Sequence, residues 1–505
     1  MSGSDGDERW QRLDPKSVLA VGVLALAPLI PTGALMTLTG AKVAAVLSMV
    51  GIWVGIAVLV SAATAVSWYF TRYRITARRF ELRAGNLSRS HRSIPRDRVR
   101  SVDLTSQPVH RLLGLSVVKI GTGQQSGADS EIKLDAVTTS RAAALRRELL
   151  RGAGQAPAAE PAEDEIARIR PAWFGYSALT ASFVLVVWGA LVSGISSLSE
   201  LVKKLGLLDA ATERFVSLPL WVGIGTVLLG MLLIGMAGSV ALSVEMWWAF
   251  RLTREPGTDS ERGDTLRVRR GLLTTRSVSL EERRLRGAEL AEPLLLRWVG
   301  GARVNAVATG LSTGQESKQP ARKTLLPPAP RAEAHRVSAA VLRERGSLAD
   351  VALRRHPRAA LRRRLIWSLA ISCPIVAASA ALALPGVPGP SWAWVVAVIA
   401  LPAAGTCAVD AYRNLGHGIA GDYLIARCGT GVRNTVALRR DGVIGWRVKQ
   451  SLFQRRAGLV TLSATTSAGH GVYAIRDVAT GEGLTFAEEA VPELLRPFLE
   501  EAPRG

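Results

Sequence analysis

Long apolar blocks alternate with long polar blocks along this chain. Six apolar segments have roughly 20 residues, the length that a helix needs to cross the ~30 Å hydrocarbon core of a bilayer. They lie in three pairs, and a long polar stretch follows each pair. Because lipid tolerates only backbone that is hydrogen-bonded internally, the pattern predicts three transmembrane helical hairpins. The predicted spans are residues 18–39, 43–69, 173–196, 218–244, 366–384 and 392–409.

The polar stretches have a shorter period. In the first of them, turn residues separate runs of alternating polar and apolar positions, and the run 117–120 is rich in β-branched residues. These features predict short antiparallel strands. Residues 138–151 then place Leu145 and Leu149 on one side of a helix whose other side is rich in arginine. A β-rich module closed by a helix is therefore expected after each hairpin.

The three modules share a skeleton, which marks them as copies of an internal repeat. Each has two glycines at a spacing of 29 residues, and an arginine stands near each glycine. The glycine pairs are Gly85 and Gly114, Gly271 and Gly300, and Gly429 and Gly458. The arginines are Arg83, Arg269 and Arg427 near the first glycine, and Arg111, Arg297 and Arg455 near the second. We predict that the glycines supply positive φ or a close backbone approach at turns.

These patterns divide the chain into nine parts. They are a cytoplasmic tail at 1–17, hairpins at 18–69, 171–246 and 365–410, modules at 70–152, 247–346 and 411–500, an acidic Pro/Ala linker at 153–170, and a basic juxtamembrane linker at 347–364. The unit that repeats is thus a transmembrane hairpin followed by a module.

Charge predicts the orientation of this arrangement. The chain has 63 Lys and Arg against 41 Asp and Glu, a net charge of +22, yet its mean hydropathy is +0.20. The basic residues gather in the modules and beside the spans, while the hairpin loops carry few. The positive-inside preference therefore predicts a multi-pass protein of the inner (cytoplasmic) membrane, with the modules and both termini in the cytoplasm.

Four short motifs follow one another in the first module. They are Tyr73-Arg74-Ile75-Thr76, Leu82-Arg83-Ala84-Gly85, Ile94-Pro95 with Val99, and Arg111-Leu112-Leu113-Gly114-Leu115. In this order they resemble the bacterial pleckstrin-homology (PH) domain of membrane proteins of the YdbS/YdbT type. The second and third modules keep only the skeleton, since Glu281 and Arg439 stand where Pro95 stands.

The resemblance implies a PH-like fold, which is a strongly bent antiparallel β-barrel capped by a C-terminal helix. The expected fold class is an α-helical polytopic membrane protein plus α+β modules, with six transmembrane helices as three hairpins and a PH-like module after each. The resemblance also implies a partner, a smaller PH-module membrane protein. It does not imply phosphoinositide binding. Because the first module matches the family best, we expect any retained binding face to lie there.

Two sets of basic residues are candidates for binding. The six repeated arginines, Arg83, Arg111, Arg269, Arg297, Arg427 and Arg455, form either a triplicated anion or partner site or a structural support beside the turn glycines, and we favour the structural role. The second set lies before the fifth span and consists of Arg354, Arg355, Arg358, Arg362, Arg363 and Arg364. Near a membrane, each such charge adds about 1 kcal/mol of attraction to anionic lipid, or it serves to set the topology of the span.

Catalytic and metal-binding patterns are weak. Residues 310–314 match the G-x-S-x-G nucleophile motif, but no helix start follows them and no Asp and His lie in a suitable order downstream. The 3 Cys have no C-x-x-C spacing and the 6 His are scattered, so we expect no metal and no cofactor. Glu245 and Asp410 lie at span ends, where water can solvate them, so no proton relay is indicated. Nucleic acid is not an expected partner, because the modules lack interleaved aromatic residues.

We therefore expect a non-enzymatic membrane protein that acts as a scaffold or accessory at the inner face of the membrane. Its expected partners are membrane lipids, through anionic headgroups, and another membrane protein. The alternative is a component of a membrane export or immunity system, in which the six helices themselves have a transporter-like role.

Overall fold

The computed structural model describes residues 10–38, 41–76, 78–85, 90–96, 99, 101–121, 131–150, 164–180, 184–185, 187–189, 193, 219–256, 263–309, 323–347, 351–382, 393–492 and 494–495. Contacts within the chain divide it into two units, Met1–Arg283 and Arg284–Gly505. The division falls inside the predicted second module, between its first and second halves. Each unit is described by itself.

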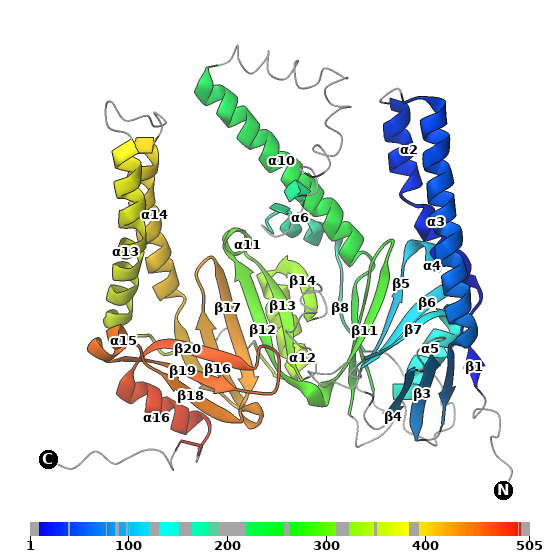
Figure 1. The fold of residues 1–505 in the computed structure, drawn as a ribbon. Helices are drawn as coiled ribbons and strands as arrows, with labels where there is room; N and C mark the ends of the chain where they lie inside the picture. Colours follow the sequence, from blue (N-terminus) through cyan, green and yellow to red (C-terminus); the bar gives the residue numbers. More distant parts are fainter. Residues whose placement is uncertain are drawn as a thin grey trace, which may run out of the picture. The chain divides into compact units, whose positions relative to one another are not determined.

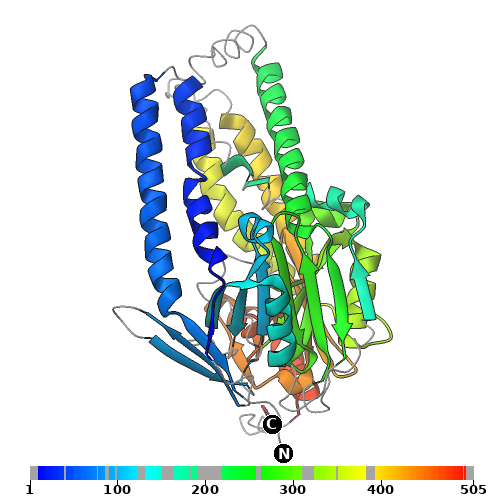
Figure 2. The ribbon, with the colours of Figure 1, turned by 90° about the vertical axis from the view of Figure 1, so that its right-hand side faces the viewer.

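The long helices of the first unit are apolar except for Lys16 at the start of the first and Glu245 near the end of the last. They are α1 (Lys16–Leu26), α2 (Leu29–Leu38), α3 (Val43–Phe70) and α10 (Leu220–Trp247). Figure 2 shows α1 beside α3, and contacts join both α1 and α2 to α3. The break between α1 and α2 lies at Pro28, which lacks the backbone N–H that a continuous helix needs. The first predicted hairpin therefore corresponds to two apolar helical segments that pack against each other, each long enough to cross a membrane.

Part of the second hairpin is also described. The predicted third span, 173–196, is described only at its start and at a few later residues, where α6 (Phe174–Ser177) follows a 3₁₀ turn at Pro171–Trp173. The hydroxyls of Ser177 and Ser243 lie 2.6 Å apart, and Trp188 donates its indole N–H to the carbonyl oxygen of Met231 at 3.2 Å. These contacts join the described parts of the segment to α10 at Ser177 and Trp188.

Two antiparallel sheets follow from the alternating positions of the first unit (Figure 1). The first sheet has the order β1 (Gln11–Arg12), β2 (Arg72–Ile75), β3 (Arg79–Ala84) and β4 (Ser90–Pro95). The second has the order β7 (Glu131–Thr138), β6 (Leu115–Gly121), β5 (Ser101–Ser106), β11 (Thr275–Glu281), β10 (Thr265–Arg270), β9 (Arg251–Glu255) and β8 (Asp164–Arg168). Residues 164–168, which the sequence assigns to a linker, therefore form a strand.

The first module encloses one hydrophobic core. Phe80 from β3, Ile120 from β6 and Leu145 from helix α5 (Thr139–Leu150) are fully buried in it. The predicted helix at 138–151 is confirmed, and its apolar side covers the space between the two sheets.

The second unit has one pair of long helices, α13 (Arg358–Leu382) and α14 (Ala393–Arg413), which pack against each other. The helix α13 begins inside the segment that the sequence assigns to the basic linker. Within the described residues of the whole chain, five helical segments are long and apolar enough to cross a membrane. The predicted span outside these five is the third, 173–196, the partly described segment beside α10.

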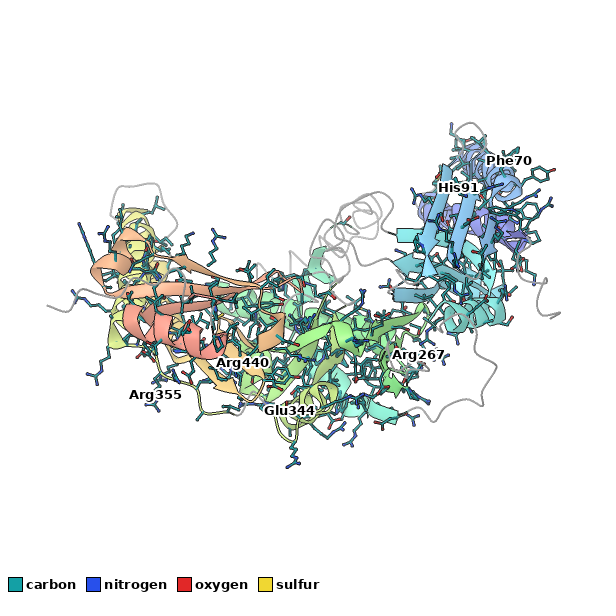
Figure 3. All side chains as sticks on the ribbon, turned by 90° about the horizontal axis from the view of Figure 1, so that it is seen from below. Phe70, His91, Arg267, Glu344, Arg355 and Arg440 are labelled. Carbon is teal, nitrogen blue, oxygen red and sulfur yellow. The ribbon has the colours of Figure 1, made fainter. Side chains whose placement is uncertain are left out.

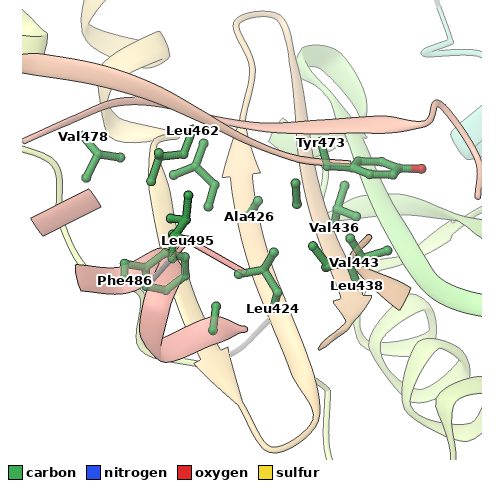
Figure 4. Close-up of a cluster of buried hydrophobic side chains, with 14 of the residues drawn as sticks. Leu424, Ala426, Val436, Leu438, Val443, Leu462, Tyr473, Val478, Phe486 and Leu495 are labelled. Carbon is green, nitrogen blue, oxygen red and sulfur yellow. The ribbon is translucent and has the colours of Figure 1, made fainter. Parts of the chain in front are cut away.

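Two sheets also form the second unit. The first has the order β14 (Thr324–Pro330), β13 (Gly301–Ala308), β12 (Leu285–Pro293), β17 (Val432–Arg439), β16 (Tyr423–Cys428) and β15 (Gly416–Ala420). The second has the order β18 (Gly445–Lys449), β19 (Leu459–Thr465) and β20 (Val472–Ala479). Helix α12 (Arg331–Leu342) follows β14, and α16 (Thr480–Ala490) follows β20. Leu424, Leu462 and Phe486 lie together in the core of the third module, as Figure 4 shows.

All six repeated glycines have positive φ, as predicted. At Gly271 and Gly429 a Cβ atom would also collide with the carbonyl oxygen of the residue three positions later, Thr274 or Val432. The second glycine of each pair follows a short helix: α4 (Pro108–Leu112), α11 (Leu294–Trp298) or α15 (Leu452–Arg456). The prediction of apolar helices combined with antiparallel β-modules is therefore confirmed.

Candidate functional site

Three of the repeated arginines hold structural contacts. Arg83 lies over the ring of Trp10, 4.2 Å from its centroid. Arg111, on α4, donates to the carbonyl oxygen of Leu272 at 2.7 Å, in the turn between β10 and β11. Arg297, at the corresponding place on α11, binds Asp410 at 2.5 Å and the side-chain oxygen of Asn414 at 3.1 Å. These contacts favour the structural interpretation.

The other three arginines differ in exposure. Arg269 on β10 and Arg455 on α15 are exposed, while Arg427 on β16 is half-buried. Burial lowers the pKa of Arg427, the nearby Arg433 lowers it further, and Glu292 opposes the shift. The described contacts give these residues separate surroundings, so no common anion site is built from them.

The two acidic residues at the span ends connect helices to modules. The Glu245 carboxylate, near the end of α10, accepts the backbone N–H groups of Leu273 and Thr274 at 3.0 and 3.1 Å. Asp410, near the end of α14, accepts from Arg297 and from the amide of Asn414. Each acid thus anchors the short helix or turn beside its span.

A cavity of about 770 Å³ lies in the second unit, where α13 and α14 meet the strands and short helix of the third module. The helices form an apolar wall that includes Trp367, Ile371 and Ile375. Charged and polar groups from β18, α15 and β20 line the opposite part. The cavity therefore joins the apolar surface of two span-length helices to a polar surface of the module.

Asp477 organises the polar part of the cavity. It is buried on β20, with a φ of 60°, a conformation that Asp tolerates better than most residues. Its carboxylate accepts from Arg363 at 2.7 Å, from Arg364 at 3.1 Å and from the amide of Gln454 at 2.9 Å. One carboxylate therefore holds two arginines of α13 at the cavity.

The remaining cations at the cavity are Lys449 and Arg476. Both are exposed, and neither has an acidic partner within ion-pair distance among the residues that the structure describes. The Nε–H groups of Arg363 and Arg364 are buried and have no hydrogen-bond partner in the same described part of the chain. Four basic side chains against one carboxylate leave this part of the cavity positively charged. An arginine guanidinium can donate two parallel hydrogen bonds to the oxygens of one phosphate or carboxylate.

Two buried histidines lie behind Asp477. His356 Nδ1 donates to the carbonyl oxygen of Asp477 at 3.1 Å, so its Nε2 accepts from His417 Nδ1, also at 3.1 Å. His417 Nε2 lies 3.8 Å from a carboxylate oxygen of Glu482. Burial lowers the pKa of His417 to about 4, with further lowering by His356 and Arg354, and burial lowers the pKa of His356 as well. Both imidazoles are therefore neutral at neutral pH.

The predicted basic cluster is divided between several environments. Arg363 and Arg364 reach the cavity, whereas Arg354 pairs with Glu489 of α16 at 2.7 Å. The other three members, Arg355, Arg358 and Arg362, are exposed, and Figure 3 labels Arg355. Only two of the six predicted lipid-contact residues thus line the cavity.

Sequence reasoning did not select Lys449, Gln454, Arg476 or Asp477. The one available signal is the pair Arg476-Asp477, two charged residues inside an otherwise apolar strand. In the described residues no group of three or more His, Cys, Asp or Glu side chains has the geometry of a metal site. The G-x-S-x-G segment at 310–314 lies outside the described residues.

Two stretches of the chain match a known family. Residues 21–153 and 375–486 match the family model of the bacterial PH domain. The first stretch contains α3 and the first module, and the second contains α14 together with β15–β20. The comparisons found no similar curated protein and no similar solved structure. The match supports the predicted bacterial PH domain, and the YdbS/YdbT type stays a prediction.

Proposed function

We propose that this bacterial PH-domain protein is a non-enzymatic scaffold of the inner membrane, whose third module holds the anionic headgroup of a phospholipid. The apolar helices make the chain membrane-associated. The observation that carries the proposal is the cavity beside α13 and α14, in which an apolar wall continues into a cationic polar part.

The chemistry of the cavity fits a phospholipid of the cytoplasmic leaflet. Acyl chains would lie along Ile371 and Ile375, and the phosphate would lie at Arg476 and Lys449, the cations that no described acid neutralises. Asp477 holds Arg363 and Arg364 behind them and so keeps the positive charge in place. The sequence favoured the first module for binding. The geometry favours the third module, where the carboxylate of Asp477 holds two arginines at the cavity. In the first module the residue of the last strand with the same φ of 60° is Ala136, which has no carboxylate.

Strand pairing supports the six-span, three-hairpin arrangement. β8 precedes the predicted third span and β9 follows α10, yet the two strands pair antiparallel. In the proposed arrangement the chain leaves and returns to the same side of the membrane between residues 168 and 251, with α10 as one crossing and the predicted third span as the other. β1 and β2 likewise pair on either side of the first hairpin. With cytoplasmic modules, both termini are cytoplasmic.

Native mass spectrometry of the purified full-length protein tests the lipid site. Phosphatidylglycerol is compared with phosphatidylcholine, and glycerol phosphate is added as a competitor to distinguish a lipid from free phosphate. We expect bound phosphatidylglycerol to fall about 30-fold when Arg476→Gln and Lys449→Gln are combined, because the two near-surface cations together contribute about 2 kcal/mol. Neither residue has a described ion pair, so the melting temperature should change little.

The matched control is Arg355→Gln combined with Arg358→Gln, which removes two exposed charges of the same region outside the cavity. This control should bind as the unmodified protein does. Equal losses of bound phosphatidylglycerol in both double variants would mean diffuse attraction to a charged surface. If glycerol phosphate bound to the cavity and phosphatidylglycerol did not, the cavity would be a site for a soluble phosphate. Either result would overturn the proposed lipid site.

A further inference from the structure

Adjacent modules join edge to edge in the same register at two places. In the first unit β5 pairs with β11, and Leu104 lies opposite Ser277. In the second unit β12 pairs with β17, and Leu290 lies opposite Thr435. Both leucines lie ten residues before the second repeated glycine of their module, and both hydroxyl residues lie six residues after the first. The joint is therefore a repeated, register-specific interaction.

The third module presents the same edge without a partner strand. β18 occupies the place that β5 and β12 occupy, since Val448 also lies ten residues before a repeated glycine, Gly458. β18 pairs with β19 on one side, and among the described strands none pairs with its other side. Ile444 and Val448 are exposed along it. An edge with free backbone groups is a template for another strand.

Charge distinguishes this edge from the two occupied ones. The residue eleven positions before the glycine is acidic in the occupied edges, Asp103 and Glu289, and basic in β18, Arg447. Residues 445–456 contain four basic residues and no acidic one. The joint itself uses opposite charges, because Glu292 faces Arg433 across it and binds it at 2.6 and 2.7 Å. A strand that complements β18 therefore carries acidic residues.

The corresponding strand of a second copy does not meet this requirement. That strand is β4, which pairs only with β3 among the described strands and carries His91, labelled in Figure 3. Counted from the repeated glycines, Arg92 corresponds to Val436 and Arg447 corresponds to Glu289. Because Val436 faces Glu289 across the joint, Arg92 would face Arg447 in the same register. Like charges directly opposite one another destabilise a pair of strands.

We propose that β18 is a docking edge for a β-strand of another protein, which pairs antiparallel to it and places carboxylates opposite Arg447 and Lys449. This surface is separate from the proposed lipid function, although Lys449 borders both. The repeated joint fixes the register, the unpaired edge supplies the backbone groups, and the reversed charge selects the partner.

A synthetic hairpin with the sequence of residues 423–439 tests the edge, because its second strand already forms this joint within the chain. One version carries Asn434→Glu and Val436→Glu, which face the positions of Lys449 and Arg447 in the register. The other carries Asn434→Arg and Val436→Arg. The full-length protein in lipid-free detergent should bind the acidic hairpin about tenfold more tightly than the basic one.

A charge-reversed protein, Arg447→Glu with Lys449→Glu, should invert this preference, which a misfolded variant would not do. Failure of the acidic hairpin to bind the unmodified protein, or a preference that survives the reversal, overturns the proposal. Because Lys449 borders both surfaces, the single variant Arg476→Gln tests the lipid site independently of this edge. A photo-crosslinking residue placed at position 448 then identifies the neighbour of β18 in native membranes. A crosslink to a strand of another protein that contains Asp or Glu supports the proposal. A crosslink to β4 of a second copy contradicts it, as does the absence of any crosslink.

Discussion

At the scale of single residues, Asp477 shows how one substitution distinguishes otherwise similar modules. Ala136 holds the same backbone conformation in the first module, where it packs beside Ala20 and Leu115. In the third module the carboxylate of Asp477 draws two arginines from α13 and leaves its carbonyl oxygen to His356. A membrane helix is thereby attached to a strand through charge rather than through apolar packing alone.

The histidine pair behind Asp477 predicts a pH dependence of stability. The pKa of His417 is about 4 in the folded protein and about 6.5 in an unfolded chain, so the unfolded chain binds its proton first as pH falls. The contribution of neutral His417 to the unfolding free energy is therefore fully present above pH 6.5. It is lost between pH 6.5 and 4, which lowers the unfolding free energy by roughly 3 kcal/mol. His356 changes it in the same direction. Thermal unfolding in detergent across this range should show a falling melting temperature.

His417→Asn provides the control for this dependence. Asparagine keeps an N–H donor for His356 and cannot take up a proton, so only the part due to His356 should remain. Parallel melting curves of the variant and the unmodified protein against pH would show that His417 does not cause the loss.

At the scale of elements, the two repeated glycines of a module serve different turns. Gly429 lies where a Cβ would collide with the backbone of Val432, whereas a Cβ at Gly458 would meet nothing within 4 Å. Both have positive φ, at 126° and 63°. The repeated spacing therefore combines a steric requirement at one turn with a conformational requirement alone at the other.

The difference predicts unequal costs of substitution. Gly458→Ala should lower the unfolding free energy by about 1–2 kcal/mol, the cost of a left-handed L-residue. Gly429→Ala should cost at least twice as much, because the turn between β16 and β17 must also move. Chemical unfolding of both variants in detergent measures the order, and a smaller loss for Gly429→Ala would refute the steric explanation.

At the scale of the whole molecule, the paired strands β8 and β9 predict an even number of crossings between them. A reporter active only in the cytoplasm should be active when fused within residues 153–163 or at the C-terminus, and inactive within residues 200–215. If the segment before α10 did not cross, the fusions at 153–163 and at the C-terminus would report opposite sides.

The apolar helices, the strands and the alignment of the modules could be predicted from the sequence, because they depend on local periodicity. Hydropathy locates the spans, alternation locates the strands, and the glycine spacing aligns the modules. The pairing of β5 with β11 could not be predicted from the sequence, since a strand pattern does not specify a partner more than 160 residues away. The cavity was missed for a similar reason, because Asp477 meets Arg363 and Arg364 only after the chain has folded.

The shared sheets have a consequence for synthesis of the chain on the ribosome. β5 is complete at Ser106, but its partner β11 ends only at Glu281. At translation rates of about 5–20 residues per second, the edge of β5 waits roughly 10–35 s for its partner. β12 waits similarly for β17, which follows a further hairpin. The first and second nascent modules thus each expose a strand edge while the next predicted hairpin is being synthesised, and a chaperone or a neighbouring nascent chain can reach that edge during the interval.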